Sequence, residues 1–244
     1  MTAECEVQFS LSKGPRNAAA TIPMKRIPSD ELLDTDAGTP QEIADSLVDL
    51  RMFNRWFGGT ACTSQLVERV ARETKAASLS LLDVAAGSGY VPLTVRHRLS
   101  SRNIDLQVTL LDRTASHLGN GGRSVVGNAL ALPFQDSSFD LVGSELFVHH
   151  LAPDQVVQFA REGLRVCRKA FVVNDLIRSS LHLALAYAGF PLYRSRITRN
   201  DAPASVRQAY SIEEMHSMLA EAGALKIETG SCFLYRMGVI AWKR

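Results

Sequence analysis

The sequence predicts an α/β protein built on a doubly wound, mostly parallel sheet. Runs rich in β-branched and leucine residues at 81–84, 108–112 and 170–177 alternate with segments of helical apolar spacing, which is the pattern of repeated strand-helix units. The first of these runs breaks into the turn 87–89, Gly-Ser-Gly, where the lack of side chains lets the backbone approach a ligand. With 244 residues, the chain is long enough for one such domain with additions.

Two segments precede that domain. Residues 1–38 mix proline, glycine, small and charged residues without sustained periodicity, so we expect a mobile N-terminal arm. Residues 39–78 are expected to form a helical cap, with one helix starting at Pro40 and stopping at Gly58-Gly59, and a second helix over about 61–76. The apolar positions of the first helix are Ile43, Leu47, Leu50, Phe53 and Phe57.

The domain itself is predicted over residues 79–244. Its strands and helices follow from alternating apolar runs and from capping residues, such as Ser211 before a helix that Gly223 closes. A lid is expected over about 176–210, between the fifth strand and the last helix. The remaining elements are a helix at 92–99, strands ending at Asp112 and Gly127, a strand at 139–144, a helix at 153–168, a strand at 170–177, and an antiparallel pair at about 224–230 and 232–242.

Composition excludes several classes of protein. The formal net charge of +2 and the charged fraction of 21% give no reason to expect a nucleic-acid partner. Cysteines 5, 62, 167 and 232 are far apart, without Cys-x-x-Cys or histidines at metal-ligand spacing, so we expect free thiols and no metal site. No apolar stretch reaches the roughly 18 residues of a membrane span, and we expect a soluble, cytoplasmic monomer or homodimer without an integral membrane segment.

Ligands of open α/β sheets bind beyond the carboxyl ends of the strands. Here those ends carry 83–89, Asp112, Asn128-Ala129 and 144–150. A carboxylate such as Asp112 can accept the hydroxyls of a ribose, which suits NAD as well as other nucleoside cofactors. Pro92 stands where the dinucleotide fingerprint has its third glycine, and it disfavours NAD.

In combination, "LLDVAAGSGY", "TLLDR" and "GNALALPFQDSSFDLV" resemble the motifs of the class I S-adenosylmethionine-dependent methyltransferases, in particular those acting on small phenolic, polyketide or quinone-like molecules. The resemblance covers about residues 79–175. It implies a Rossmann-like sheet of seven strands with an antiparallel last strand, and S-adenosylmethionine as the cofactor. For Asp83, a turn-capping role is as good an interpretation as cofactor contact. The implied cofactor residues are Arg55, Asp83, Ala85, Gly87, Gly89, Asp112, Arg113, Asn128, Ala129, Leu130, Ser144 and Glu145.

Methyl transfer to a hydroxyl requires positioning and removal of a proton. A histidine with its ordinary pKa of ~6.5 is suited to assist this step. His149 and His150 follow the fourth strand of the domain, and Asp175 ends the fifth, where it can orient one of them. By the resemblance, His149 or His150 is the general base and Asp175 its partner. The alternative is that one histidine packs and the other caps the helix beginning near Pro153.

The lid is unusually apolar, which suits an aromatic or lipid-like acceptor. The alternative interpretation of this segment is a helix that completes the core or forms a dimer contact. We therefore expect methyl transfer to a hydroxyl of a small aromatic acceptor. Competing hypotheses are methylation of a ring carbon, a nucleic-acid methyltransferase, a NAD-dependent oxidoreductase, and a cofactor-binding partner subunit without catalysis. The candidate acceptor-binding residues are Leu181, Leu185, Tyr187, Tyr193 and Arg194, although a solvated face is the better interpretation of the arginine.

Overall fold

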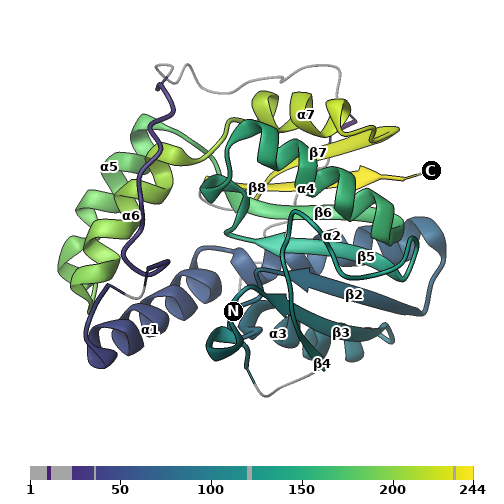
Figure 1. The fold of residues 1–244 in the computed structure, drawn as a ribbon, viewed down its shortest axis with the longest axis horizontal. Coiled ribbons are helices and arrows are strands. Elements are labelled where there is room, and N and C mark those ends of the chain that lie inside the picture. The colour runs from purple at the N-terminus through teal and green to yellow at the C-terminus, as the bar shows by residue number, and fades with distance from the viewer. Residues whose placement is uncertain (1–9, 12–23, 36, 120–122, 233–234, 244) are drawn as a thin grey trace.

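The computed structural model describes residues 10–11, 24–35, 37–119, 123–232 and 235–243 (Figure 1). One sheet contains all the strands, in the order β1-β7-β8-β6-β5-β2-β3-β4. Strands β2 to β6 pair parallel with one another, whereas β8 runs antiparallel to both β6 and β7. The strands are β1 (Ser10–Leu11), β2 (Ser78–Val84), β3 (Asp105–Asp112), β4 (Arg123–Val126), β5 (Phe139–Glu145), β6 (Cys167–Leu176), β7 (Lys226–Cys232) and β8 (Arg236–Trp242).

This is the predicted sheet of seven strands, extended at one edge. The two residues of β1 pair antiparallel with β7, through Ser10 with Thr229 and Leu11 with Glu228. The sequence did not indicate this edge strand, because a two-residue run carries no periodicity. The predicted antiparallel pair near the C-terminus is confirmed as β7 and β8.

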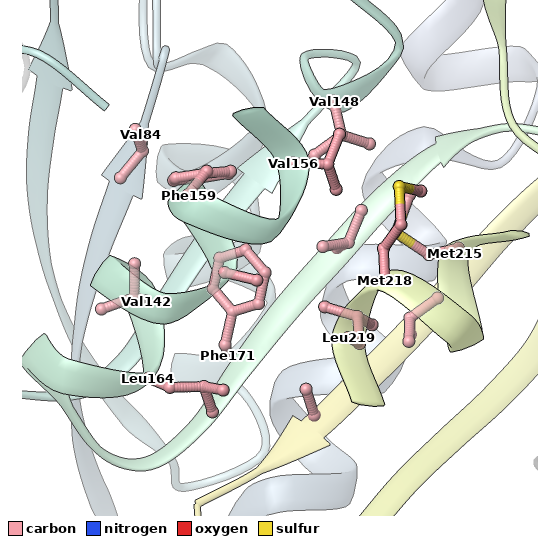
Figure 2. Close-up of a cluster of buried hydrophobic side chains, with 14 of the residues drawn as sticks. Val84, Val142, Val148, Val156, Phe159, Leu164, Phe171, Met215, Met218 and Leu219 are labelled. Carbon is pink, nitrogen blue, oxygen red and sulfur yellow. The ribbon is translucent and has the colours of Figure 1, made fainter. Parts of the chain in front are cut away.

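Helices cover both faces of the sheet. Helix α4 (Pro153–Val166) and α7 (Ile212–Glu221) pack on one face, and α2 (Gly59–Thr74) packs against α3 (Tyr90–Ser100) and against β6 and β8 on the other (Figure 1). The cluster under α4 and α7 includes Phe159, Phe171 and Met215, each at most 1% exposed (Figure 2). A second cluster lies under α2 and α3. These cores fix the strand ends on which the site depends.

Three further helices lie together beyond one end of the sheet (Figure 1). They are α1 (Pro40–Trp56), α5 (Ser180–Ala188) and α6 (Arg196–Gln208), and α6 packs against both of the others. Helix α1 starts at a capping box, in which the Thr39 hydroxyl accepts from the amide of Glu42 and the Glu42 carboxylate accepts from the amide of Thr39. Helix α1 of the expected cap and the lid helices, far apart in sequence, therefore form one layer over the carboxyl ends of the parallel strands, whereas α2, the other helix of that cap, packs on a face of the sheet.

Residues 24–35 belong to the segment from which we expected a mobile arm, and they differ from that expectation. This segment, called the strap from here on, lies along α6. The amide of Ile27 donates to the carbonyl of Arg207, and the amides of Leu32 and Leu33 donate to the carboxylate of Asp201. Arg26 reaches the carbonyls of Gln208, His149 and Leu151. The rest of the expected arm, apart from β1, falls largely outside the described residues.

The expectation of free thiols is wrong for one pair. Cys62 in α2 and Cys232 at the end of β7 form a disulfide with Cα atoms 5.9 Å apart, although 170 positions separate them. Cysteine spacing could not reveal this pair, because only the packing of α2 across the sheet brings the two residues together. Cys167 is a buried free thiol. Among the described residues, no helix is both long and apolar enough to cross a bilayer.

Candidate active site

The turn between β2 and α3 is shaped by backbone conformation. Ala85, Gly87 and Gly89 have φ values of 57°, 49° and 70°. A Cβ on Gly89 would lie 2.5 Å from a methyl of Leu110, so this position is closed to side chains, whereas a Cβ on Gly87 would meet nothing within 4 Å. The turn thus presents bare backbone to an open space, which is what a closely held ligand requires.

That open space is part of a cavity of about 1200 Å³. Its wall comes from the strap, α1, the glycine turn, the ends of β3, β4 and β5, the residues after β5, and the lid helices. Predicted site residues that line it are Ala85, Gly87, Asp112, Arg113, Asn128, Ala129, Leu130, Glu145, His149, His150, Leu185 and Tyr193. Predicted site residues outside the lining are Arg55, Asp83, Gly89, Ser144, Asp175, Leu181, Tyr187 and Arg194.

Asp112 organises the half of the cavity next to the turn. Its Oδ2 accepts from the amide of Gly87 at 3.0 Å, and its Oδ1 accepts from the amide of Thr114 at 3.1 Å. Asn128 stabilises the loop after β4 in a similar way, since its side-chain oxygen accepts from the amide of Leu130 at 2.9 Å. Three features fit a nucleoside cofactor that carries a further substituent: a carboxylate at a strand end, a loop held by the Asn128 side chain, and a glycine that faces open space.

Two carboxyl groups lie beneath the turn. Asp83 is fully buried, and neither of its oxygens has a hydrogen-bond donor among the described residues. Burial raises the pKa of Asp83 well above its ordinary value, and the charges of Glu145 and Asp112 raise it further. Burial also raises the pKa of Glu145, and it outweighs the hydrogen bond from Thr63, which lowers that pKa. The raised pKa values show that negative charge on this pair is disfavoured by burial, and a positively charged group beside it in the cavity would offset that cost.

His149 is the most constrained polar side chain in the wall. It is 3% exposed, and its Nδ1 lies 2.6 Å from Oδ1 of Asp175. Its Nε2 lies 3.6 Å from Oε1 of Glu31 in the strap. Burial lowers the pKa of His149, but the carboxylates of Asp175 and Glu31 outweigh burial and raise the pKa to about 10. The ring is thus an imidazolium at neutral pH, unlike the base titrating near neutrality on which the sequence interpretation relied.

His150 lies beside His149 with the ring centroids 4.1 Å apart. Its Nδ1 is 2.8 Å from Oδ2 of Asp34, a second carboxylate of the strap. Glu31, His149 and His150 each offer one atom that could bind a metal, all within 4.8 Å of one another. Oε1 of Glu31 already accepts from Ser205 at 2.5 Å and from Gln208 at 2.7 Å, which favours a hydrogen-bonded ion pair at this position.

Several predicted site residues lie away from the cavity. Arg55 points out of the cavity and lies over the ring of Trp56, itself 68% exposed, because the last turn of α1 leaves both on the solvent side. Leu181 and Tyr187 are 54% and 43% exposed on the outer face of α5. Arg194 is exposed, and its amide donates to the buried carboxylate of Asp49. The lid therefore presents only part of its apolar surface to the cavity.

The structure also brings residues to the cavity that the sequence did not indicate. Glu31 and Asp34 come from the expected arm. Arg236, at the start of β8, is 2% exposed and donates to the side-chain oxygens of Asn54 at 3.0 Å and Asn174 at 3.2 Å. No local pattern distinguishes these residues. Glu31 and Asp34 lie in a segment without periodicity, and the apolar run of β8 indicates a buried strand without singling out Arg236.

A glycine turn after the first parallel strand and a carboxylate at the end of the next form the kind of sheet edge at which open α/β folds bind nucleotide cofactors. The chain matches the family model of a methyltransferase domain over residues 82–171. The matched residues run from β2 into β6 and include the glycine turn and Asp112.

Solved structures give the same fold. The chain is similar to the plantazolicin methyltransferase BpumL, solved with a monoazolic desmethylPZN analog and S-adenosylhomocysteine, at 11% identity and a TM-score of 0.65 over 88% of this chain and 94% of the other. It is also similar to an S-adenosylmethionine-dependent methyltransferase from Aquifex aeolicus, at 18% identity and a TM-score of 0.50 over 72% and 89%. No curated protein matches the chain in sequence.

Proposed function

We propose that the protein transfers a methyl group from S-adenosylmethionine to a hydroxyl group of a small aromatic acceptor, and that His149 contacts that hydroxyl. The observation that carries the proposal is the buried His149–Asp175 pair, 2.6 Å between Nδ1 and Oδ1, in the wall of the cavity that also contains the glycine turn. A buried imidazole oriented by a carboxylate is a common means of handling a proton.

The cofactor half of the cavity is assigned by chemistry. Asp112 would hold the ribose hydroxyls, the loop at Asn128 would flank the base, and the amino acid portion would lie along the turn above Asp83 and Glu145, where a positive charge is favoured. When bound, the cofactor supplies an activated methyl group. The protein then has only to orient the acceptor, exclude water and manage one proton.

The acceptor half is apolar. Phe53 of α1 and Tyr193 of the lid meet edge to face with centroids 5.4 Å apart, and both line the cavity together with Leu50 and Leu185. Aromatic and aliphatic walls of this kind favour a flat, apolar acceptor over a charged one. Phenols, hydroquinones and acyl resorcinols fit this description, and the hydroxyl of such an acceptor would point to His149.

A direct test has two stages. Calorimetric titration with S-adenosylhomocysteine should show binding, and mass spectrometry across phenols, hydroquinones and acyl resorcinols should show a product heavier by one methyl group. NMR of the product separates an ether from a ring-methylated compound. Absence of cofactor binding would overturn the whole proposal, and methylation at carbon alone would overturn the hydroxyl assignment.

A further inference from the structure

Glu31 faces the same atom of His149 at which the acceptor hydroxyl is placed. It lies in the strap, outside the matched domain, yet it lines the cavity and is only 8% exposed. Its Oε1 is 3.6 Å from Nε2 of His149, too long for a hydrogen bond. A hydroxyl oxygen placed about 2.8 Å from both atoms would bridge this gap with two good hydrogen bonds.

The two atoms across the gap have opposite hydrogen-bonding capacity. Nδ1 of His149 donates to Asp175, and the carboxylates of Asp175 and Glu31 raise the pKa of the ring to about 10, so Nε2 also carries a proton at neutral pH and has no lone pair to offer. Burial raises the pKa of Glu31, but the charges of His149 and His150 and the hydrogen bond from Ser205 outweigh burial and lower it, so the carboxylate is ionised at neutral pH. Of the two groups, the carboxylate is the one that can accept a proton.

The rest of the surroundings keep this arrangement in place. Ser205 and Gln208 of α6 both donate to Oε1 of Glu31, which fixes the carboxylate against the lid. The Ser205 hydroxyl can donate instead to the carbonyl of Asp201 at 2.9 Å, which frees a lone pair of Oε1 for an incoming proton. Arg26 of the strap holds the carbonyl of His149 at 3.0 Å. Other titratable groups near His149 are Asp175 on β6, Asp34 in the strap and the adjacent His150. Arg236 on β8 also acts on the Asp175 side, because its charge interacts with that carboxylate.

We propose that Glu31 is the general base of the reaction: it accepts the proton of the acceptor hydroxyl, while His149 donates a hydrogen bond to the same oxygen. This assignment rests on the proposed methyl transfer to a hydroxyl. As the O–H bond breaks, its electron pair stays on oxygen and forms the new bond to the methyl carbon. The C–S bond of the sulfonium breaks with its pair going to sulfur, and the proton ends on the Glu31 carboxylate. The reaction thus consumes one sulfonium charge and one carboxylate charge.

The test compares Glu31→Gln with Asp30→Asn, an exposed carboxylate in the same strap. The glutamine keeps an oxygen for Ser205 and Gln208, so the strap should stay in place. With a weakly acidic phenol, kcat of Glu31→Gln should fall roughly 100- to 10,000-fold, the range of general base catalysis. With a nitrophenol already ionised at the assay pH, the variant should approach wild-type kcat, because no proton has to be removed. Asp30→Asn should match wild type with both acceptors.

Equal losses with both acceptors would show a structural role for Glu31 and overturn the assignment, as would unchanged kcat with the weakly acidic phenol. A readout without turnover is the ¹⁵N NMR spectrum of the His149 ring in the wild-type protein. Two protonated ring nitrogens at neutral pH are expected, and a neutral ring would overturn the assignment even where no acceptor has been found. Failure of the proposed function differs from all of these results, since wild type itself would then methylate no hydroxyl of any acceptor.

Discussion

The amide of Gly87 donates to Oδ2 of Asp112 at 3.0 Å, and this bond joins the turn after β2 to the end of β3. One carboxylate therefore both closes the turn and presents itself to the cavity. The two glycines of the turn differ in what they tolerate, because a side chain on Gly87 would face open space and one on Gly89 would meet Leu110.

Replacement of Gly87 by alanine should weaken cofactor binding while leaving the fold intact. Its φ of 49° costs an alanine only about 1 kcal/mol, but the added methyl projects into the space assigned to the cofactor. Calorimetry with S-adenosylhomocysteine should show a lower affinity beside a nearly unchanged melting temperature. The matched change Gly89→Ala should lower the melting temperature far more, and equal behaviour of the two variants would contradict this view of the turn.

Asp112→Ala should reduce the affinity for S-adenosylhomocysteine by roughly 10- to 100-fold, corresponding to the loss of about 1.5–3 kcal/mol for hydrogen bonds to a charged group. Calorimetric titration measures the change directly. Asp105→Ala at the opposite end of the same strand, where the carboxylate is exposed and accepts from Ser78, is the control and should bind as wild type does. An unchanged affinity in Asp112→Ala would move the ribose away from this carboxylate.

The two histidines should differ in their effect on turnover. His149→Ala removes the side chain that faces both Asp175 and Glu31, so kcat should fall by roughly 100- to 1,000-fold, as on loss of a hydrogen-bond donor to a developing oxyanion. His150→Ala loses only the partner of Asp34 and should cost far less. Steady-state kinetics with a phenol that the wild-type enzyme methylates will show which variant loses more kcat. A larger loss in His150→Ala would reverse our assignment.

Stability should fall as the pH rises through the range in which Asp83 ionises. A carboxyl group whose pKa is raised in the folded state contributes stability that is fully present below its unfolded pKa of ~3.9 and is lost above its folded pKa. Thermal unfolding between about pH 5 and pH 8 should therefore show a smaller decrease for Asp83→Asn than for wild type. Parallel pH profiles for the two proteins would mean that Asp83 is ionised throughout.

The disulfide between Cys62 and Cys232 should contribute to stability. Closing so long a loop restricts the unfolded chain, and the usual contribution of a disulfide is about 2–4 kcal/mol. Urea unfolding of the double variant Cys62→Ser, Cys232→Ser should show a loss in this range. A reducing agent should destabilise wild type and leave the double variant unchanged, whereas sensitivity of both proteins would assign the effect to another cause.

Much of the cofactor half of the site could be predicted from local sequence. A strand followed by the Gly-Ser-Gly turn, and a second strand ending in Asp112, fix which residues face the cavity because parallel strands end at one edge of the sheet. Arg55 shows where this reasoning fails. Helical spacing identified α1 correctly, but the face of the helix that meets the cavity depends on how α1 packs against α6, and Asn54 faces inward instead.

The sequence by itself determined the order of strands and helices, the glycine turn and the closeness of Asp175 to one of the two histidines, because these follow from periodicity and from the geometry of adjacent parallel strands. Only the tertiary structure decided which carboxylate faces the other nitrogen of His149 and which cysteines pair. Glu31 and His149, like Cys62 and Cys232, meet through packing between segments far apart in the chain. Such contacts are set by the total burial of apolar surface, and no short stretch of sequence records them.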